Sequence, residues 1–229
     1  MKDLLPVLIV FILLVAGGAF FITNASSTTS EEASTQRAST LQQNNVDNAV
    51  KLTIGNPSAE ATVVEYFDYK CPSCNSFHRT TGAEIEQNYV DTDLANIEVR
   101  ITPIIGPDSA NAGRGAYCAL EQGLFEEYHG TVLDYMYDNY YSSGNFESEF
   151  QNILTTSTLA SISEPLGIDT GVFTNCVDSD RFNSNLDNNL LLAADDEIQG
   201  TPGFAVGQQS FVGGQPYSVF KTLLDIELR

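Results

Sequence analysis

The sequence "VVEYFDYKCPSCNSF", residues 63–77, decides the fold. It begins as a run of β-branched and aromatic residues, which predicts a buried strand over residues 61–69. Two cysteines follow, Cys71 and Cys74, and Pro72 comes directly after the first. Proline is well tolerated in the first turn of a helix, because its missing N–H has no partner to lose there. The stretch therefore predicts a strand that leads into a helix ending near residue 88, with Cys71 at or near the helix N-cap.

The predicted place of Cys71 bears on its reactivity, because the thiolate and not the thiol is the nucleophile. Unpaired backbone N–H groups and the positive end of the helix dipole favour negative charge on the sulfur. Lys70 is expected to add a cation next to it. Cys74 lies one turn along the same helix, within reach of a disulfide to Cys71 and less exposed. This spacing predicts one sulfur that attacks, Cys71, and one that resolves the mixed disulfide, Cys74.

Two other uses of this cysteine pair stay open from the residues alone, a zinc site and an inert structural disulfide. A zinc site usually draws on a second such pair or on closely spaced histidines. The remaining cysteines, Cys118 and Cys176, are far apart in the sequence, and the histidines are His78 and His129. We expect His78 on the helix surface and His129 in a structural role. No metal and no cofactor is therefore expected.

The length of the chain bears on the number of domains, and its charge excludes some classes of binding partner. The chain has 229 residues, a net charge of −20 and only 10 Lys and Arg residues. This length suits one domain that buries a sizeable core. Binding to nucleic acid or anionic lipid needs clustered basic residues, so neither is an expected partner.

The N-terminal part of the chain is expected to lie outside the fold. Residues 1–22 include an uncharged apolar run at 4–22, about the length of a transmembrane helix, which predicts a signal anchor with the rest of the chain outside the cytoplasm. A cleaved signal peptide is the alternative, and it exports the domain as well. Residues 23–48 are polar and lack aromatic residues, so they predict a flexible tether.

Residues 49–229 are predicted to form an α/β domain. A second strand is expected over residues 96–104, and mostly helical patterns follow over residues 108–199. The segment "GTPGFAVGQQSFVGG", residues 200–214, returns to short strands, and residues 216–229 form an amphipathic terminal helix. The order predicts an α/β core with a helical insertion at about 108–199.

The segment "GNPSAEATVVEYFDYKCPSCNSF", residues 55–77, together with the downstream "QGTPGFAVG", residues 199–207, resembles the DsbA-like thiol–disulfide oxidoreductases, especially their membrane-tethered Gram-positive relatives. The resemblance runs from about residue 52 to the C-terminus. It implies a thioredoxin-like fold with a helical insertion. It also implies an enzyme that introduces disulfides into exported proteins through residues 71–74. A reductase or isomerase using the same site, or a tethered peptide-binding holdase, remain alternatives.

Several residue roles follow from this resemblance. Thr201 and Pro202 correspond to the cis-proline loop that faces the cysteines; an ordinary turn is the alternative. Glu65 corresponds to the buried acid beneath the pair, which can relay a proton to or from Cys74. Strand alternation alone leaves open whether Glu65 faces outward. Asp68 and Lys70 are expected at the rim of the site.

The residue between the cysteines departs from the best-known oxidases, which carry histidine where this chain has Ser73. A serine hydroxyl brings no charge that would stabilise the reduced thiolate. A milder oxidant is therefore expected.

The resemblance also bears on the other cysteines and on the partners. Stray thiols in an exported oxidase would be oxidised, so Cys118 and Cys176 are expected to form a structural disulfide. Such a bridge stabilises by about 4 kcal/mol in the chain-entropy model. Two buried free thiols are the alternative. The expected partners are unfolded exported proteins with free thiols and a quinone-linked reoxidant in the membrane, and the protein is expected to be a monomer.

Overall fold

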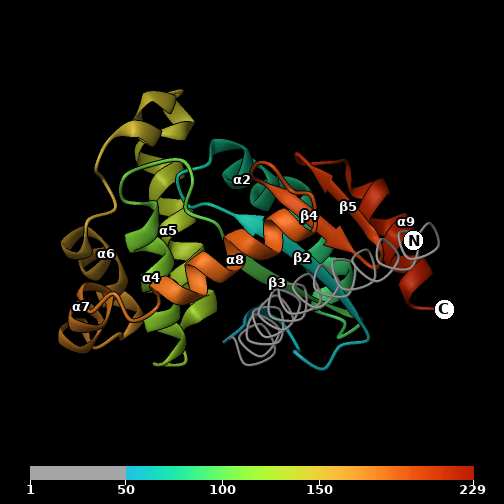
Figure 1. Ribbon diagram of the computed structural model, residues 1–229, viewed down its shortest axis with the longest axis horizontal. Coiled ribbons are helices and arrows are strands. Elements are labelled where there is room, and N and C mark those ends of the chain that lie inside the picture. The colour runs from blue at the N-terminus through green and yellow to red at the C-terminus, as the bar shows by residue number, and fades with distance from the viewer. Residues whose placement is uncertain (1–49) are drawn as a thin grey trace, which may run out of the picture. The chain divides into compact units, whose positions relative to one another are not determined.

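Five strands form one mixed sheet in the order β1-β3-β2-β4-β5 in the computed structural model, which describes residues 50–229 (Figure 1). Strand β2 lies at the centre and runs parallel to β3, whereas the other pairs are antiparallel. The strands are β1 (Leu52–Ile54), β2 (Ala61–Phe67), β3 (Ala95–Ile101), β4 (Gly203–Val206) and β5 (Gln209–Val212).

The two central strands were readable from their β-branched residues, and the short edge strand β1 was not. Strand β2 ends at Phe67, two residues before the predicted end, and β3 ends at Ile101 rather than at residue 104. The backbone turns at these points because Asp68 accepts hydrogen bonds from the N–H groups of Ile104 and Ile105, at 2.8 and 2.9 Å. Both strands therefore stop at the edge of the sheet where the cysteine pair lies.

A long helical run follows β2, and Cys71 and Cys74 lie at its start. It begins with α2 (Pro72–Phe77) and α3 (Ala83–Ile85), and π-helical turns occupy His78–Gly82 and Glu86–Val90. The sequence predicted one helix to about residue 88. Single π turns inside helices occur frequently at functional sites, and here the first one begins at His78.

Helices cover both faces of the sheet, and the alternation along β2 decides what each face meets. Phe77 of α2 packs against Phe204 of β4 with ring centroids 4.5 Å apart, and Phe220 of α9 (Tyr217–Glu227) lies 4.9 Å from Phe204. On the opposite face Tyr66 packs with residues at the end of α8 (Asn183–Asp195), and its hydroxyl donates to Asp196 at 2.5 Å. Glu65, next to Tyr66 in the strand, therefore points to the face that carries α2.

The helical insertion lies between β3 and β4. Its helices gather beside the sheet, and α8 then crosses back over one face (Figure 1). The predicted α/β core with a helical insertion is confirmed. The insertion contains α4 (Ser109–Leu120), α5 (Phe125–Asn139), α6 (Thr156–Ser163), α7 (Thr170–Asp178) and α8, with 3-10 turns at Tyr141–Ser143, Phe146–Phe150 and Glu164–Leu166.

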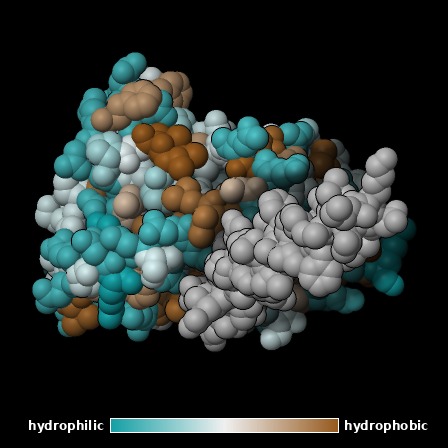
Figure 2. Space-filling model, viewed as in Figure 1, coloured by the Kyte–Doolittle hydropathy of each residue, from teal (hydrophilic) through white to brown (hydrophobic). Residues whose placement is uncertain are grey.

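The insertion shares one hydrophobic core with the sheet and has its own covalent link. Cys118 of α4 and Cys176 of α7 form a disulfide that spans 58 residues. Apolar side chains also reach the surface, among them Phe146 and Phe150 at 53% and 64% exposure. In the space-filling view, apolar surface on this face gathers between the insertion and the strands (Figure 2).

The predicted anchor, residues 1–22, and the predicted tether, residues 23–48, lie outside the described residues. Within residues 50–229 no helix combines the length and the apolar character needed to cross a bilayer.

Candidate active site

Cys71 is the N-cap residue of α2, as the sequence predicted. Its backbone is extended, Pro72 opens the helix, and the backbone N–H of Cys74 donates to the Cys71 sulfur at 3.2 Å. The Cys71 thiol in turn donates to the carbonyl oxygen of Thr201 at 3.3 Å. Both cysteines are free thiols in this structure, and they are 4% and 0% exposed. The helix start therefore directs an amide donor at one sulfur and covers the other.

The two sulfurs of the pair are shifted in opposite directions. The pKa of Cys71 is lowered, chiefly by the hydrogen bond from the Cys74 side chain and further by the side chain of Thr201 and the Cys74 amide, against the effect of burial. The pKa of Cys74 is raised well above its usual value, first by burial and then by its hydrogen bond to Cys71. The reduced pair thus keeps its negative charge on Cys71 and its proton on Cys74.

Thr201 and Pro202 lie beside the cysteines, joined by a cis peptide bond. They directly precede β4, which pairs with β2, and Gly213 donates to the carbonyl oxygen of Pro202 at 2.7 Å. The Thr201 hydroxyl is buried and has no well-aligned hydrogen-bond partner among the described residues. The sheet therefore holds the loop against the start of α2, and the Thr201 carbonyl contacts the Cys71 sulfur.

Glu65 is fully buried on the face of β2 that meets α2, which settles the question left open by strand alternation. Its Oε2 atom lies 3.1 Å from Nε2 of His78, and the His78 side chain is only 7% exposed. His78 is thus not on the helix surface, and that prediction is wrong. Burial lowers the pKa of His78, but the charge of Glu65 and its hydrogen bond raise it more, so that the net shift is upward from 6.5.

His129 of α5 lies close to this pair and behaves differently. Its ring centroid is 4.9 Å from that of His78, and its Nδ1 atom is 3.0 Å from the Tyr69 hydroxyl. Burial, together with the charge of His78, lowers the pKa of His129 well below 6.5. His129 therefore stays neutral over the pH range in which His78 takes up its proton, in keeping with a structural role.

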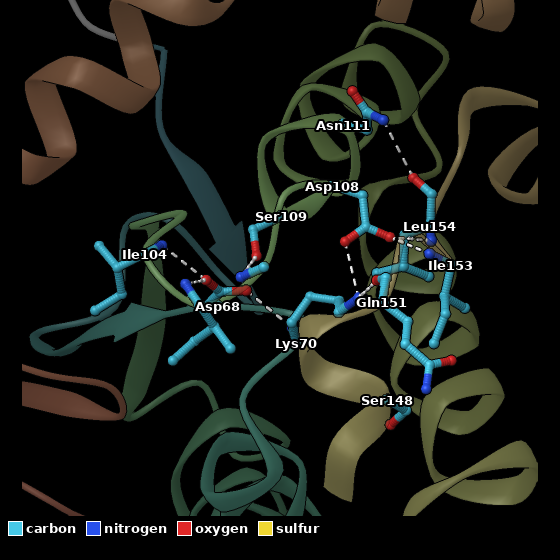
Figure 3. A network of polar contacts seen from close by, with 12 residues as sticks. Asp68, Lys70, Ile104, Asp108, Ser109, Asn111, Ser148, Gln151, Ile153 and Leu154 are labelled. Carbon is cyan, nitrogen blue, oxygen red and sulfur yellow. Dashed lines mark hydrogen bonds and ion pairs between the residues drawn. The ribbon is translucent and has the colours of Figure 1, made fainter.

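Asp68 and Lys70 do not line the rim of the site, contrary to the expectation from the sequence. Both are 0% exposed, and the Lys70 ammonium pairs with Asp108 at 2.8 Å (Figure 3). It also donates to the backbone carbonyl of Gln151. The Lys70 side chain is thus directed into the insertion, and its charge does not lower the pKa of Cys71. The charge of Asp68 slightly raises that pKa.

The buried ion pair attaches the residue before Cys71 to the insertion (Figure 3). Asp108 also accepts hydrogen bonds from the backbone N–H groups of Ile153 and Leu154, so its carboxylate is fully used. Tyr141 donates its hydroxyl to the backbone carbonyl of Lys70 at 2.9 Å. The start of α2 is consequently fixed from both the sheet and the insertion.

The structure brings most of the predicted site residues together and leaves one pair apart. At the site are Cys71, Cys74, Glu65, Thr201 and Pro202. The disulfide of Cys118 and Cys176 lies within the insertion. The sequence places His78 four residues after Cys74, one turn further along the helix, but the helix-surface position that we favoured for it is wrong, because it shares the buried face of Cys74. Among residues 50–229, no group of three or more His, Cys, Asp or Glu residues is arranged to hold a metal ion.

A family model described as thioredoxin matches residues 47–226. The chain belongs to the thioredoxin family. A Rickettsia prowazekii protein, provisionally named a protein-disulfide oxidoreductase, is 28% identical over 156 residues, which cover 68% of this chain and 53% of that protein. A Rickettsia conorii protein of the same provisional name is 28% identical over 179 residues, 74% of this chain and 61% of its own length. This thioredoxin-family chain spans little more than half the length of these curated relatives.

Solved structures resemble this thioredoxin-family chain over most of its described length. BdbD from Bacillus subtilis, in its oxidised form, aligns with a TM-score of 0.67 and 22% identity, covering 78% of this chain and 92% of that one. DsbA from Chlamydia trachomatis aligns with a TM-score of 0.63 and 19% identity, covering 76% and 89%. The likeness to these structures shows a shared thioredoxin-like fold with a helical insertion. The predicted resemblance to DsbA-like proteins is thereby confirmed.

Proposed function

We propose that the protein is a thiol–disulfide oxidoreductase of the DsbA type that introduces disulfides into exported proteins. One observation carries the proposal: Cys71 caps a helix, accepts an amide hydrogen bond and contacts the Thr201 carbonyl, while Cys74 is fully buried behind it. This arrangement makes one sulfur a good leaving group and attack point and reserves the other for closing the internal disulfide.

The exchange balances electrons and protons in two steps. The enzyme starts with a Cys71–Cys74 disulfide, and a substrate thiolate attacks the Cys71 sulfur, so that Cys74 leaves and takes up a proton. A second substrate thiolate then attacks the substrate sulfur of the mixed disulfide, and Cys71 leaves as a thiolate. The substrate dithiol loses two electrons and the enzyme disulfide gains them.

The stabilised Cys71 thiolate supplies the driving force for oxidising a substrate. Its lowered pKa favours the reduced enzyme, which makes the disulfide form an oxidant. Ser73, exposed between the cysteines, adds no charge to this stabilisation, so the potential should be milder than that of relatives with histidine there. An extended substrate segment could pair with backbone groups beside Pro202 as an added strand.

The cellular setting belongs to the same proposal. An uncharged run at residues 4–22 would anchor the enzyme in the membrane with its site outside the cytoplasm, where disulfides form and persist. A quinone-linked membrane protein would return the enzyme to its disulfide form after each turnover. The acidic chain, with a net charge of −20, is suited to neither nucleic acid nor anionic lipid as a partner, and it acts as a monomer.

The test is oxidation of a reduced, unfolded model protein by the purified oxidised enzyme, with glutathione disulfide as the terminal oxidant. We expect multiple turnover by the wild type and none by Cys71→Ser. Full activity in Cys71→Ser would rule out this mechanism. The reduction potential of the Cys71–Cys74 couple separates an oxidase from a reductase: a value near that of thioredoxin, about −270 mV, would favour the reductase.

A further inference from the structure

We propose that His78 carries a proton between Glu65 and solvent. This is the proton that Cys74 must gain and lose in each catalytic cycle. The inference deepens the proposed function and rests on it. Cys74 is 0% exposed, so neither the proton it needs when it leaves the disulfide nor the one it releases on reoxidation can come directly from bulk water. A connected chain of titratable groups must reach it.

Glu65 and His78 supply the inner part of this chain. Glu65 is 0% exposed and lies on the face of β2 that meets α2, the helix that carries buried Cys74, and its charge raises the pKa of Cys74. Neither of its oxygens, and not Nε2 of His78 either, makes a well-aligned hydrogen bond to any residue in the described part of the chain. The two groups face each other at 3.1 Å, which leaves the carboxylate with the imidazole as its polar neighbour.

A cavity supplies the outer part of the chain. It has a volume of about 350 Å³ and is lined by His78 and His129 at its buried end and by exposed Glu126 and Asp134 farther out. Water has the space and the polar partners to enter a cavity of this size and polarity. The imidazole of His78 therefore contacts Glu65 on one side and a space leading to solvent on the other.

The charges around the imidazole favour its protonated form. They come from every element packed against it: Glu65 from β2, Arg79 and Glu86 from its own helical run, and Glu126, His129 and Asp134 from α5. Carboxylates predominate in this set, and His129 is kept neutral by burial. The imidazolium can thus form in a buried place and donate to Glu65.

The proton steps then follow in order. When a substrate thiolate attacks Cys71, the Cys71–Cys74 bond breaks, and the His78 imidazolium gives its proton to the Glu65 carboxylate, which passes it on to the Cys74 sulfur. His78 then regains a proton from water in the cavity. Reoxidation runs the same transfers backward, so no proton and no electron is left over.

The test is the single-turnover reduction of the oxidised enzyme by a monothiol peptide from pH 5 to pH 9. His78→Gln keeps a polar side chain near Glu65 but cannot titrate, and we expect it to slow the step on the order of 10²-fold. As the pH rises through the His78 pKa, the wild type loses its imidazolium donor, so its rate constant should fall. This fall should be absent from the pH profile of His78→Gln. The ratio of the two rate constants cancels the ionisation of the attacking peptide.

Two further variants separate a proton role from a structural one. Arg79→Lys changes the same cavity wall, keeps its charge and does not touch Glu65, so it should keep the wild-type pH profile. His78→Ala leaves space for a small base, and added imidazole should restore much of its lost rate. A wild-type rate and pH profile in His78→Gln, or a slow His78→Ala that imidazole fails to rescue, would overturn the proposal. A wild type that oxidises nothing would instead overturn the proposed function.

Discussion

The two cysteine pairs of this molecule are similarly buried, but their sulfurs lie at different ends of helices. Cys71 and Cys74 are 4% and 0% exposed, and Cys118 and Cys176 are 1% and 5% exposed. The first pair is three residues apart and reduced in this structure, whereas the second spans 58 residues and is bonded. Burial therefore does not distinguish an exchanging pair from a permanent one.

The polar surroundings distinguish them instead. Cys71 sits at the N-terminal end of α2, where the helix dipole and the Cys74 amide favour a thiolate. Cys176 lies close to the C-terminal end of α7, where the helix dipole disfavours a thiolate, and the Arg181 guanidinium lies 3.0 Å from its sulfur. A good leaving sulfur thus exists in the first pair, where Cys71 contacts the Thr201 carbonyl and the charge of Glu65 acts on Cys74.

The largest expected effect is the loss of turnover when a sulfur is removed from the first pair, compared with removal of the whole second pair. Cys74→Ala should abolish multiple turnover, because it cannot form the Cys71–Cys74 disulfide that accepts the electrons of the substrate, and mixed disulfides at Cys71 should accumulate because Cys74 can no longer displace them. The paired variant Cys118→Ala/Cys176→Ala should keep the turnover of the wild type. Turnover and non-reducing gel electrophoresis measure both. Loss of turnover in a folded insertion variant would mean that the second pair takes part in the electron path.

The next effect tests the buried ion pair between Lys70 and Asp108, which connects the segment before Cys71 to the helical insertion. Lys70→Met leaves the Asp108 carboxylate buried and unpaired, which should lower the free energy of unfolding by about 3–5 kcal/mol. Urea denaturation at fixed redox state measures it. Adding Asp108→Asn removes the unpaired charge and offers an amide to the Gln151 carbonyl, so the double variant should recover part of the loss. Equal stability of single variant and wild type would contradict the pairing.

A comparable effect on stability, without a loss of activity, is expected from the insertion disulfide. Removing a bridge of 58 residues with Cys118→Ala/Cys176→Ala should lower the free energy of unfolding by up to about 4 kcal/mol. The urea midpoint should fall in the variant. An unchanged midpoint would show that the unfolded chain is already constrained there or that the bond strains the native state.

The site could be predicted from the sequence where local rules decide it. The helix start at Cys71 follows from Pro72 and the cysteine spacing. The partner of Lys70 lies 38 residues away at Asp108, and no local pattern reports such a contact. Strand alternation allowed Glu65 to lie on either face of the sheet, and only the packing of α2 shows which face it occupies. His78 could have been found by asking which residue shares a helix face with Cys74.

The smallest effect concerns how the Thr201 side chain tunes the reactive sulfur. Thr201→Val removes the hydroxyl, which lowers the pKa of Cys71 without a well-aligned hydrogen bond, and keeps the shape and the carbonyl, so it should raise that pKa slightly toward its usual value. Because the folded pKa is lowered, the stability that Cys71 contributes to the reduced protein is present above the unfolded pKa. That stability is lost as pH falls through the folded pKa, and the variant should lose it at a higher pH.

Thiolate absorbance at 240 nm during a pH titration of the reduced protein measures this shift, because Cys74 keeps its proton over the same range. Thr201→Ser retains the hydroxyl and should titrate close to the wild type. The shift should be smaller than the one in Cys74→Ala, since the Cys74 side chain lowers the pKa of Cys71 more than Thr201 does. A midpoint that stays in place in Thr201→Val would assign the stabilisation of the sulfur to the helix start and to Cys74 alone.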